Sequence, residues 1–134
     1  MEGKLLSVII PVYNEQEVLL SAYERFEAAL KSIGHPYELI FVDDGSTDYT
    51  MPILRKLAGN NDSIKALSFS RNFGHQLAVT AGMDAAAGSA LIIIDVDLQD
   101  PPELIAEMVK LWEQGAKIVY GKRLKRKGET IFKR

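Results

Sequence analysis

Segment 91–103 contains the side chains with the clearest chemical potential, because an apolar run ends there on oxygen-bearing residues. Asp95, Asp97 and Gln99 are spaced two residues apart, so they lie on one side of the backbone if it stays extended. Carboxylate and amide oxygens are the ligands that hard cations such as Mg²⁺ and Mn²⁺ prefer. We therefore predict that these three residues hold a divalent metal.

Two further acids in the same segment follow a different pattern. Asp100 is followed directly by Pro101, and Glu103 comes three residues after Asp100, which is typical of a capped helix start. We interpret Asp100 and Glu103 as helix-starting residues only. Asp95 and Asp97 have no such role, and two carboxylates at the end of an isoleucine-rich strand repel each other unless a positive charge joins them.

The composition describes an ordinary globular chain of 134 residues, long enough for one domain with a core. The net charge of −2 indicates no affinity for nucleic acid, but the charge is uneven. Segment 122–134 has seven basic residues and one acid, whereas segment 1–121 has nine basic and 17 acidic residues. Cysteine is absent, which excludes disulfides and thiolate metal sites, and no apolar run approaches the ~18 residues of a membrane span.

Hydrophobic periodicity predicts strands and helices in alternation. Strands are expected at 5–12, 38–42, 64–69, 90–94 and 117–120. Four helices are expected: from about 14 to 32, from the turn after the second strand to about 58, at 76–87 and at 101–114. This order predicts an α/β fold with a mostly parallel, doubly wound sheet and helices on both faces. Pro11 is expected at the end of the first strand, because proline cannot donate to a sheet ladder.

Polar clusters follow three of the predicted strands, namely Tyr13-Asn14-Glu15, Asp43-Asp44 and Asp95 to Gln99. In a parallel sheet they share one edge, where converging acids are costly unless a cation or a ligand joins them. A nucleotide diphosphate with a divalent metal meets this need, since the metal offsets the repulsion and a carboxylate can accept bonds from a base or ribose. The sequence has neither a G-x-G-x-x-G turn after the first strand nor a P-loop.

Four blocks in order resemble the family 2 inverting glycosyltransferases of the Rossmann-like GT-A fold, in which nucleotide-diphosphate sugars are bound. The blocks are Ser7–Glu15, Phe41–Asp48, Arg71–Gly74 and Asp95–Glu103. The last block, Asp-x-Asp-Leu-Gln-Asp-Pro-Pro-Glu, resembles the branch with dolichyl-phosphate mannose synthase and bacterial polyprenyl-phosphate glycosyltransferases. Catalytic domains of that family continue beyond a fifth strand. We therefore expect a truncated fold, with a nucleotide-sugar-binding domain at 1–121 and a basic tail at 122–134 that leads into a missing acceptor-binding part.

The resemblance implies a role for each matching residue. Asp97 is the expected catalytic residue, and Asp95, Asp97 and Gln99 would hold the metal on the diphosphate. Either Asp43 or Asp44 would meet the base, and the sequence leaves this choice open. The expected nucleotide-binding residues are Pro11, Val12, Tyr13, Glu15, Asp43, Asp44, Arg71, Asp95 and Val96.

Structural roles compete with several of these expectations. Residues 44–47 could form only a turn, Arg71 could be only a surface cation, and Tyr13 could serve packing alone. His75 is expected to anchor a helix start and not to catalyse.

The implied function is a metal-dependent, inverting transfer of a hexose from a nucleotide-diphosphate sugar to a polyprenyl phosphate or another cell-envelope acceptor. Basic side chains of the tail would bind the acceptor phosphate, namely Arg123, Arg126 and Arg134. The expected location is cytoplasmic, at the inner face of the membrane through the missing C-terminal part. Homo-oligomerisation is left open.

Other function classes match part of the sequence. A phosphoacceptor receiver-like signalling domain shares the size, the five-stranded sheet and a lysine after the last strand, Lys122, but its acid pair follows the first strand, whereas Asp43-Asp44 follows the second. A haloacid-dehalogenase-like phosphatase also places its Asp-x-Asp motif after the first strand, so Asp95-Val96-Asp97 is misplaced for it. An inactive sugar-nucleotide-binding module would retain the site without turnover.

Overall fold

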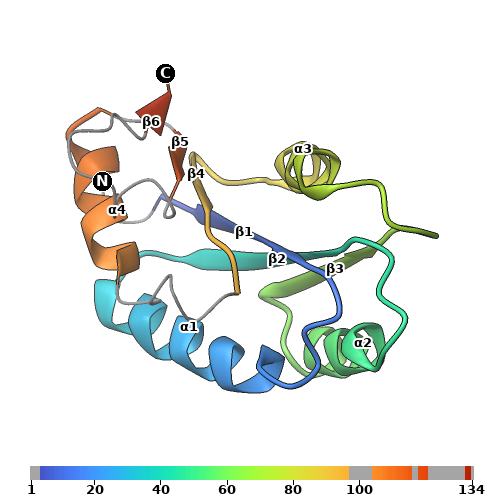
Figure 1. Cartoon of the computed structure of the whole chain (residues 1–134). Helices are drawn as coiled ribbons and strands as arrows, with labels where there is room; N and C mark the ends of the chain where they lie inside the picture. The colour runs from blue at the N-terminus through green and yellow to red at the C-terminus, as the bar shows by residue number, and fades with distance from the viewer. Residues whose placement is uncertain (1–3, 97–103, 116–117, 121–131, 134) are drawn as a thin grey trace.

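The computed structural model describes residues 4–96, 104–115, 118–120 and 132–133 (Figure 1). This part of the chain contains one six-stranded sheet with the order β3-β2-β1-β4-β5-β6. Neighbouring strands from β1 to β5 pair in parallel, and β6 pairs antiparallel with β5. The strands are β1 (Leu6–Val12), β2 (Tyr37–Asp43), β3 (Ile64–Ser68), β4 (Ala90–Ile93), β5 (Ile118–Tyr120) and β6 (Phe132–Lys133). The predicted α/β fold with a mostly parallel sheet is confirmed.

Helices cover both faces of the sheet, as predicted (Figure 1). Helices α1 (Leu19–Ile33), α2 (Thr50–Asn60) and α4 (Leu104–Glu113) pack on one face, and α3 (His75–Ala85) packs on the other. Because strand residues alternate between faces, Val8 of β1 packs in the cluster with α1, whereas Ile9 packs in the cluster with α3. None of the described helices has the length and apolar character of a membrane span.

The central position of β1 determines which residues meet at the site. Its last residue, Val12, is in register with Asp43 of β2, and its other neighbour is β4. The residues that follow β1, β2 and β4 therefore emerge at one edge of the sheet. Pro11 is the second-to-last residue of β1, close to the predicted strand end.

The start of α1 differs most from the prediction, because the helix begins at Leu19 and not at residues 14–15. Asn14 has a φ of 51°, which lies in the left-handed region and cannot belong to a right-handed helix. Its backbone N–H donates to Ser46 Oγ at 2.8 Å, so the segment is bound to the loop after β2. Helix α1 ends at Ile33, close to the expected end at about residue 32, and the C-cap residue Gly34 has a φ of 90°.

The C-terminal part confirms the predicted fifth strand and adds one element. Strand β6 lies within the segment interpreted as a basic tail, and it is in register with Ile118 and Val119 of β5. This strand was not predicted. The rest of segment 121–134 and the expected helix-starting residues Asp100 and Glu103 lie outside the described residues.

A buried polar cluster occupies the N-terminal end of the sheet. Glu38 of β2 accepts hydrogen bonds from Ser7 Oγ at 2.6 Å and from the Ala87 N–H at 2.7 Å, and its other oxygen lies 2.8 Å from Lys65 Nζ. Burial raises the pKa of Glu38, but the bonds from Lys65, Ser7 and Ala87 outweigh this effect and leave the pKa below its ordinary value. The negative charge of Glu38 is therefore neutralised by Lys65, and its oxygens have hydrogen-bond donors within the protein.

Candidate active site

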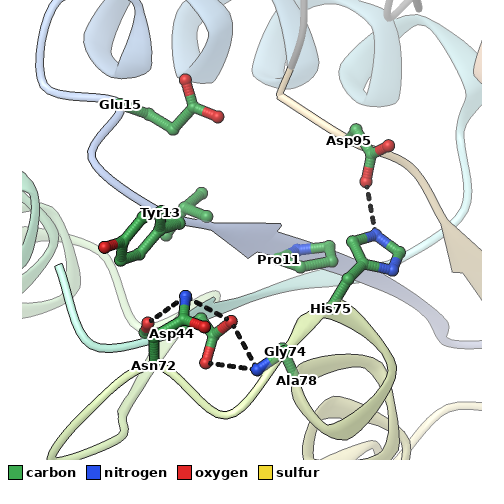
Figure 2. A pocket seen from close by; sticks show the side chains of 10 residues that line it. Pro11, Tyr13, Glu15, Asp44, Asn72, Gly74, His75, Ala78 and Asp95 are labelled. Carbon is green, nitrogen blue, oxygen red and sulfur yellow. Dashed lines mark hydrogen bonds and ion pairs between the residues drawn. The ribbon is translucent and has the colours of Figure 1, made fainter.

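A cavity of about 370 Å³ opens at the C-terminal edge of the sheet (Figure 2). Open α/β sheets bind ligands at this edge. The lining residues come from the end of β1 and the loop after it, from the segments after β2 and β4, and from the start of α3 with the residues before it. They are Pro11, Val12, Tyr13, Glu15, Asp44, Asn72, Gly74, His75, Ala78 and Asp95. Six of the nine predicted nucleotide-binding residues therefore share one cavity.

Three carboxylates lie in the wall of this cavity, on Glu15, Asp44 and Asp95. Figure 2 shows Glu15 and Asp95 on one side of the cavity and Asp44 on the opposite side. The described lining residues include no lysine or arginine. The cavity is thus acidic, and a ligand that carries a divalent cation would complement its charge.

Asp44 is held by the segment that leads into α3. The backbone N–H groups of Phe73 and Gly74 donate to its carboxylate at 2.7 and 3.0 Å, and Asn72 Nδ2 donates at 3.1 Å. A carboxylate is favourable here, because the N-terminus of a helix carries a partial positive charge. Asp44 therefore joins the end of β2 to the start of α3.

Gly45 allows the two loops to approach each other. It has a φ of 78°, and a Cβ atom there would overlap the backbone of Arg71 and Asn72. A glycine is required on both counts, since only glycine lacks the Cβ atom and adopts this φ without cost. The Asp-Asp-Gly sequence thus includes a close packing contact beside the cavity.

Residues 46–50 bind the loop that follows β1. The Thr47 N–H donates to Asn14 Oδ1 at 2.8 Å, and the Glu15 N–H donates to Thr50 Oγ1 at 2.9 Å. These bonds place Glu15 at the cavity and explain why helix α1 starts late.

Asp48 connects this loop to helix α2. It accepts hydrogen bonds from the Thr50 N–H at 2.9 Å and from the Gln16 N–H at 3.3 Å. Burial raises the pKa of Asp48, but the bonds from Thr50 and Gln16 outweigh it and leave the pKa below its ordinary value. Asp48 therefore binds both the first residue of α2 and the loop after β1, and it holds the two together.

Asp95, the first residue of the predicted metal-binding pattern, contacts the start of α3. Its Oδ1 atom lies 2.9 Å from Nε2 of His75, and Figure 2 shows the pair at one side of the cavity. Because a carboxylate can only accept, the His75 Nε2 atom is the donor. Asp95 also lies 16% exposed, so it remains open to a ligand.

The family model described as glycosyl transferase family 2 matches residues 7–134. The chain belongs to glycosyl transferase family 2. Within this family, it is 51% identical over 128 residues to an uncharacterized glycosyltransferase of Bacillus subtilis, with 96% of the chain and 40% of that relative covered. It is 40% identical over 129 residues to a prophage bactoprenol glucosyl transferase homolog of Escherichia coli, with 96% and 42% covered. The chain thus spans about 40% of the length of the curated relatives that it matches.

Two solved structures share the fold. A mannosyltransferase from Pyrobaculum calidifontis, in complex with GDP-Man and Mn²⁺, matches with a TM-score of 0.62 and 22% identity, over 72% of this chain and 28% of that one. TarS of S. aureus in complex with UDP-GlcNAc matches with a TM-score of 0.63 and 23% identity, over 85% and 32%. The predicted family and GT-A fold are confirmed, and the signalling-domain alternative is excluded.

Three predicted nucleotide-binding residues of this family 2 chain do not line the cavity. Asp43 is 2% exposed and accepts a bond from the Ser46 N–H at 3.2 Å. The Arg71 guanidinium lies 4.5 Å from the centre of the Phe73 ring, and Val96 is buried in the core on the side of α1. Of the two adjacent acids at the end of β2, it is therefore Asp44 that lines the cavity.

The remaining predicted residues lie outside the described part of the chain, namely Asp97, Gln99, Arg123, Arg126 and Arg134. Among the described residues, no group of three or more histidine, aspartate or glutamate side chains could hold a metal. Asp95 is thus the one predicted metal ligand whose position is described, and it lies in the cavity wall.

Sequence reasoning missed the contribution to the cavity of the segment that leads into α3 and of the first turn of α3, namely Asn72, Gly74, His75 and Ala78. The signal was present in part, because segment 71–74 is one of the blocks that resemble the family. His75 follows that block directly, but the expected role was a helix anchor. Its contact with Asp95 depends on how α3 crosses the sheet, which no local pattern encodes.

Proposed function

We propose that the protein transfers a hexose from a nucleotide-diphosphate sugar to a polyprenyl phosphate, with a divalent metal and with inversion at the anomeric carbon. The observation that supports this most is the cavity itself. It gathers Tyr13, Asp44 and Asp95 from three distant segments at the edge where α/β sheets bind ligands. The names of the relatives, which include bactoprenol glucosyl transferases, support the acceptor class.

The nucleoside end of the donor would lie against Pro11, Val12, Tyr13 and Glu15, with Asp44 accepting bonds from the base or ribose. A carboxylate held by neutral donors keeps acceptor capacity, because each oxygen has two lone pairs. Three further residues are proposed to bind the nucleotide, namely Asp43, Arg71 and Val96. Each is adjacent in the chain to a lining residue but does not itself line the cavity.

A divalent metal is consistent with the donor atoms at the site. Asp95 supplies a carboxylate to the cavity wall, and Mg²⁺ and Mn²⁺ prefer oxygen ligands. Asp95 would share the ion with Asp97, Gln99 and the donor diphosphate. When bound, the ion would supply positive charge to the leaving diphosphate. The Mn²⁺ complex of the Pyrobaculum calidifontis mannosyltransferase supports this choice of metal.

The proposed reaction is a single displacement at the anomeric carbon. An acceptor phosphate oxygen attacks the anomeric carbon from the face opposite the diphosphate. The bond between that carbon and the diphosphate oxygen breaks, and its electron pair leaves with the nucleoside diphosphate, so the configuration inverts. Since a phosphate monoester has a second pKa of about 6, this nucleophile is largely ionised at neutral pH and needs little help from a general base. Asp97 is the proposed catalytic residue, because it would orient the leaving diphosphate.

The acceptor phosphate is proposed to bind the basic residues Arg123, Arg126 and Arg134, which would place the protein at the cytoplasmic face of a membrane. Segment 122–134 has seven basic residues and one acid, so anionic headgroups would be attracted to it.

Calorimetry with UDP-, GDP- and CDP-sugars, with and without Mn²⁺, tests the donor site. We expect one base to bind in the presence of Mn²⁺, and Asp95→Asn to remove most of the metal dependence. Asp84→Asn is the matched control, because Asp84 is exposed and lies about 14 Å further along α3 than His75. If no sugar nucleotide binds under any metal condition, the proposed function is wrong.

Transfer to a polyprenyl phosphate is the second step of the test. Substituting Arg123, Arg126 and Arg134 with glutamine should weaken binding to vesicles that contain polyprenyl phosphate and should leave nucleotide binding nearly unchanged. Donor binding without transfer by the longest available form of the protein would instead indicate a sugar-nucleotide-binding module.

A further inference from the structure

His75 is the first residue of α3, and its side chain lines the cavity beside Asp95 (Figure 2). We infer that His75 is a positioning residue, which fixes the Asp95 carboxylate in the orientation that receives the metal-bound diphosphate of the donor. This inference rests on the proposed function, and it assigns a role to a residue that the sequence pattern left as a helix anchor.

The arrangement of the strands explains why such a residue is useful. Asp44 follows β2 and Asp95 follows β4, and these two strands lie on either side of β1. Two strand spacings separate their ends, which corresponds to roughly 10 Å. A donor that contacts Asp44 at one end and Asp95 at the other needs both carboxylates held at a fixed separation.

The start of α3 contacts both carboxylates. The N–H groups of Phe73 and Gly74 bind Asp44, and the next residue, His75, binds Asp95 at 2.9 Å. Three consecutive residues therefore connect the two sides of the cavity. Because these three residues are adjacent in the chain, movement of one carboxylate relative to the other is restricted.

The contact does not resemble that of a helix-anchoring side chain. Such a side chain would bond to the first turn of its own helix, whereas His75 Nε2 reaches Asp95, 20 residues further along the chain. The cap residue Gly74 has no side-chain cap, and the first backbone bond of α3 runs from the Ala78 N–H to the Gly74 carbonyl without His75. The His75 side chain is 57% exposed, so packing is a minor part of its contribution.

The hydrogen bond does not require a particular protonation state of His75. Nε2 carries a proton in one neutral tautomer and in the imidazolium, and it donates to Asp95 in both. Groups that hydrogen-bond a metal ligand typically change metal affinity by 10- to 100-fold when they are removed. The same range is expected for His75.

Three substitutions separate positioning from a general structural effect. His75→Gln places an amide N–H near the position of Nε2, His75→Asn places it near Nδ1 and short of Asp95, and His75→Leu removes the donor. In calorimetry with Mn²⁺ and a nucleoside diphosphate, we expect His75→Leu and His75→Asn to bind roughly 10- to 100-fold more weakly. His75→Gln should stay within about threefold of the wild type if the amide restores the hydrogen bond.

Two readouts make the outcomes distinct. Urea unfolding shows whether each variant is folded, and nucleotide binding without Mn²⁺ should be nearly equal in all of them. If the wild type binds no nucleotide with Mn²⁺, the proposed function fails. If the wild type binds and His75→Leu binds equally well, or if folded His75→Gln loses as much as His75→Asn, the positioning role of His75 is overturned and the proposed function stands.

Discussion

Carboxylates are buried at both ends of the sheet, in different surroundings. At the N-terminal end, Glu38 is paired with the ammonium group of Lys65 and receives two further hydrogen bonds. At the C-terminal end, the described partners of Asp44 are neutral donors, and its side chain lines a cavity. Glu38 and Asp44 are almost equally buried, at 6% and 5% exposed. Burial of an acid is therefore a poor sign of function, whereas the absence of an internal counter-charge beside a cavity indicates a binding site.

The largest expected effect comes from two glycines, one at each end. A Cβ atom on Gly45 would overlap the backbone of Arg71 and Asn72, and one on Gly88 would lie 2.5 Å from Ser7 Oγ. We expect Gly45→Ala to lower the free energy of unfolding by about 4 kcal/mol, because left-handed strain adds to overpacking. Gly88→Ala should cost about 2 kcal/mol. Urea unfolding measures the two stabilities. Calorimetry on the folded protein should then show weaker nucleotide binding for Gly45→Ala and unchanged binding for Gly88→Ala.

Gly34→Ala is the control for backbone strain alone. Gly34 has a φ of 90°, but a Cβ atom there would meet no other atom within 4 Å. This variant should lose only about 1–2 kcal/mol. Equal losses for Gly45→Ala and Gly34→Ala would mean that the two loops at the cavity do not approach each other as described.

A smaller effect separates stability from binding. Glu38→Ala leaves the Ser7 hydroxyl and the Ala87 N–H without their acceptor, which should lower the free energy of unfolding by about 3 kcal/mol. Nucleotide binding by the folded protein should not change. Urea unfolding and calorimetry with Mn²⁺ measure the two quantities.

The counterpart at the cavity is Asp44→Asn, which keeps the size of the side chain and removes its charge. It should lower stability by only about 1–2 kcal/mol, because an amide group then faces the N–H donors. Nucleotide binding should weaken at least tenfold, or about 1.4 kcal/mol. If Glu38→Ala impaired binding as much as Asp44→Asn, the distinction between the two ends of the sheet would be lost.

The smallest effect is a pH dependence from the N-terminal end. The pKa of Glu38 in the folded protein lies below its ordinary value of 4.5. Its contribution to stability is therefore complete above pH 4.5 and is lost as the pH falls through the lowered pKa. When the pH is lowered from about 5 to about 3, the free energy of unfolding should fall by about 1 kcal/mol less for Glu38→Gln than for the wild type. Urea unfolding at each pH measures this difference.

Asp48 contributes in the same direction, because its pKa is also lowered in the folded protein. In the double variant of Glu38→Gln with Asp48→Asn, the free energy of unfolding should therefore fall less at acidic pH than in Glu38→Gln alone. If both variants lost as much stability at acidic pH as the wild type, these hydrogen bonds would not stabilise the charged carboxylates.

Most of the fold could be predicted from local patterns. The apolar, β-branched runs of β1 and β4 indicate strands buried on both faces, and the helical spacing of apolar residues predicted α1 and α4. The error at the start of α1 has a clear cause. Asn14 and Glu15 are bound by residues more than 30 positions away, and such bonds leave no mark on local periodicity.

The site was predictable in its acids but not in its donors. Six lining residues were expected from the blocks at the strand ends, whereas the residues from the start of α3 were not. Carboxylates at strand ends are recognisable in a sequence, because converging acids are costly unless a cation or a ligand joins them. Backbone N–H groups and a single histidine are not, since every helix start offers similar groups.

The sequence alone determined the order along the chain of the elements from β1 to β5, and the acids at the ends of β1, β2 and β4, because both depend on local patterns and residue chemistry. Only the tertiary structure decided that Asp44 and not Asp43 faces the cavity, and that His75 meets Asp95. Adjacent residues of an extended chain point to opposite sides, so the choice between Asp43 and Asp44 depends on the register of β2. The contact of His75 depends on the path of α3 from β3, at one edge of the sheet, to β4 beside β1.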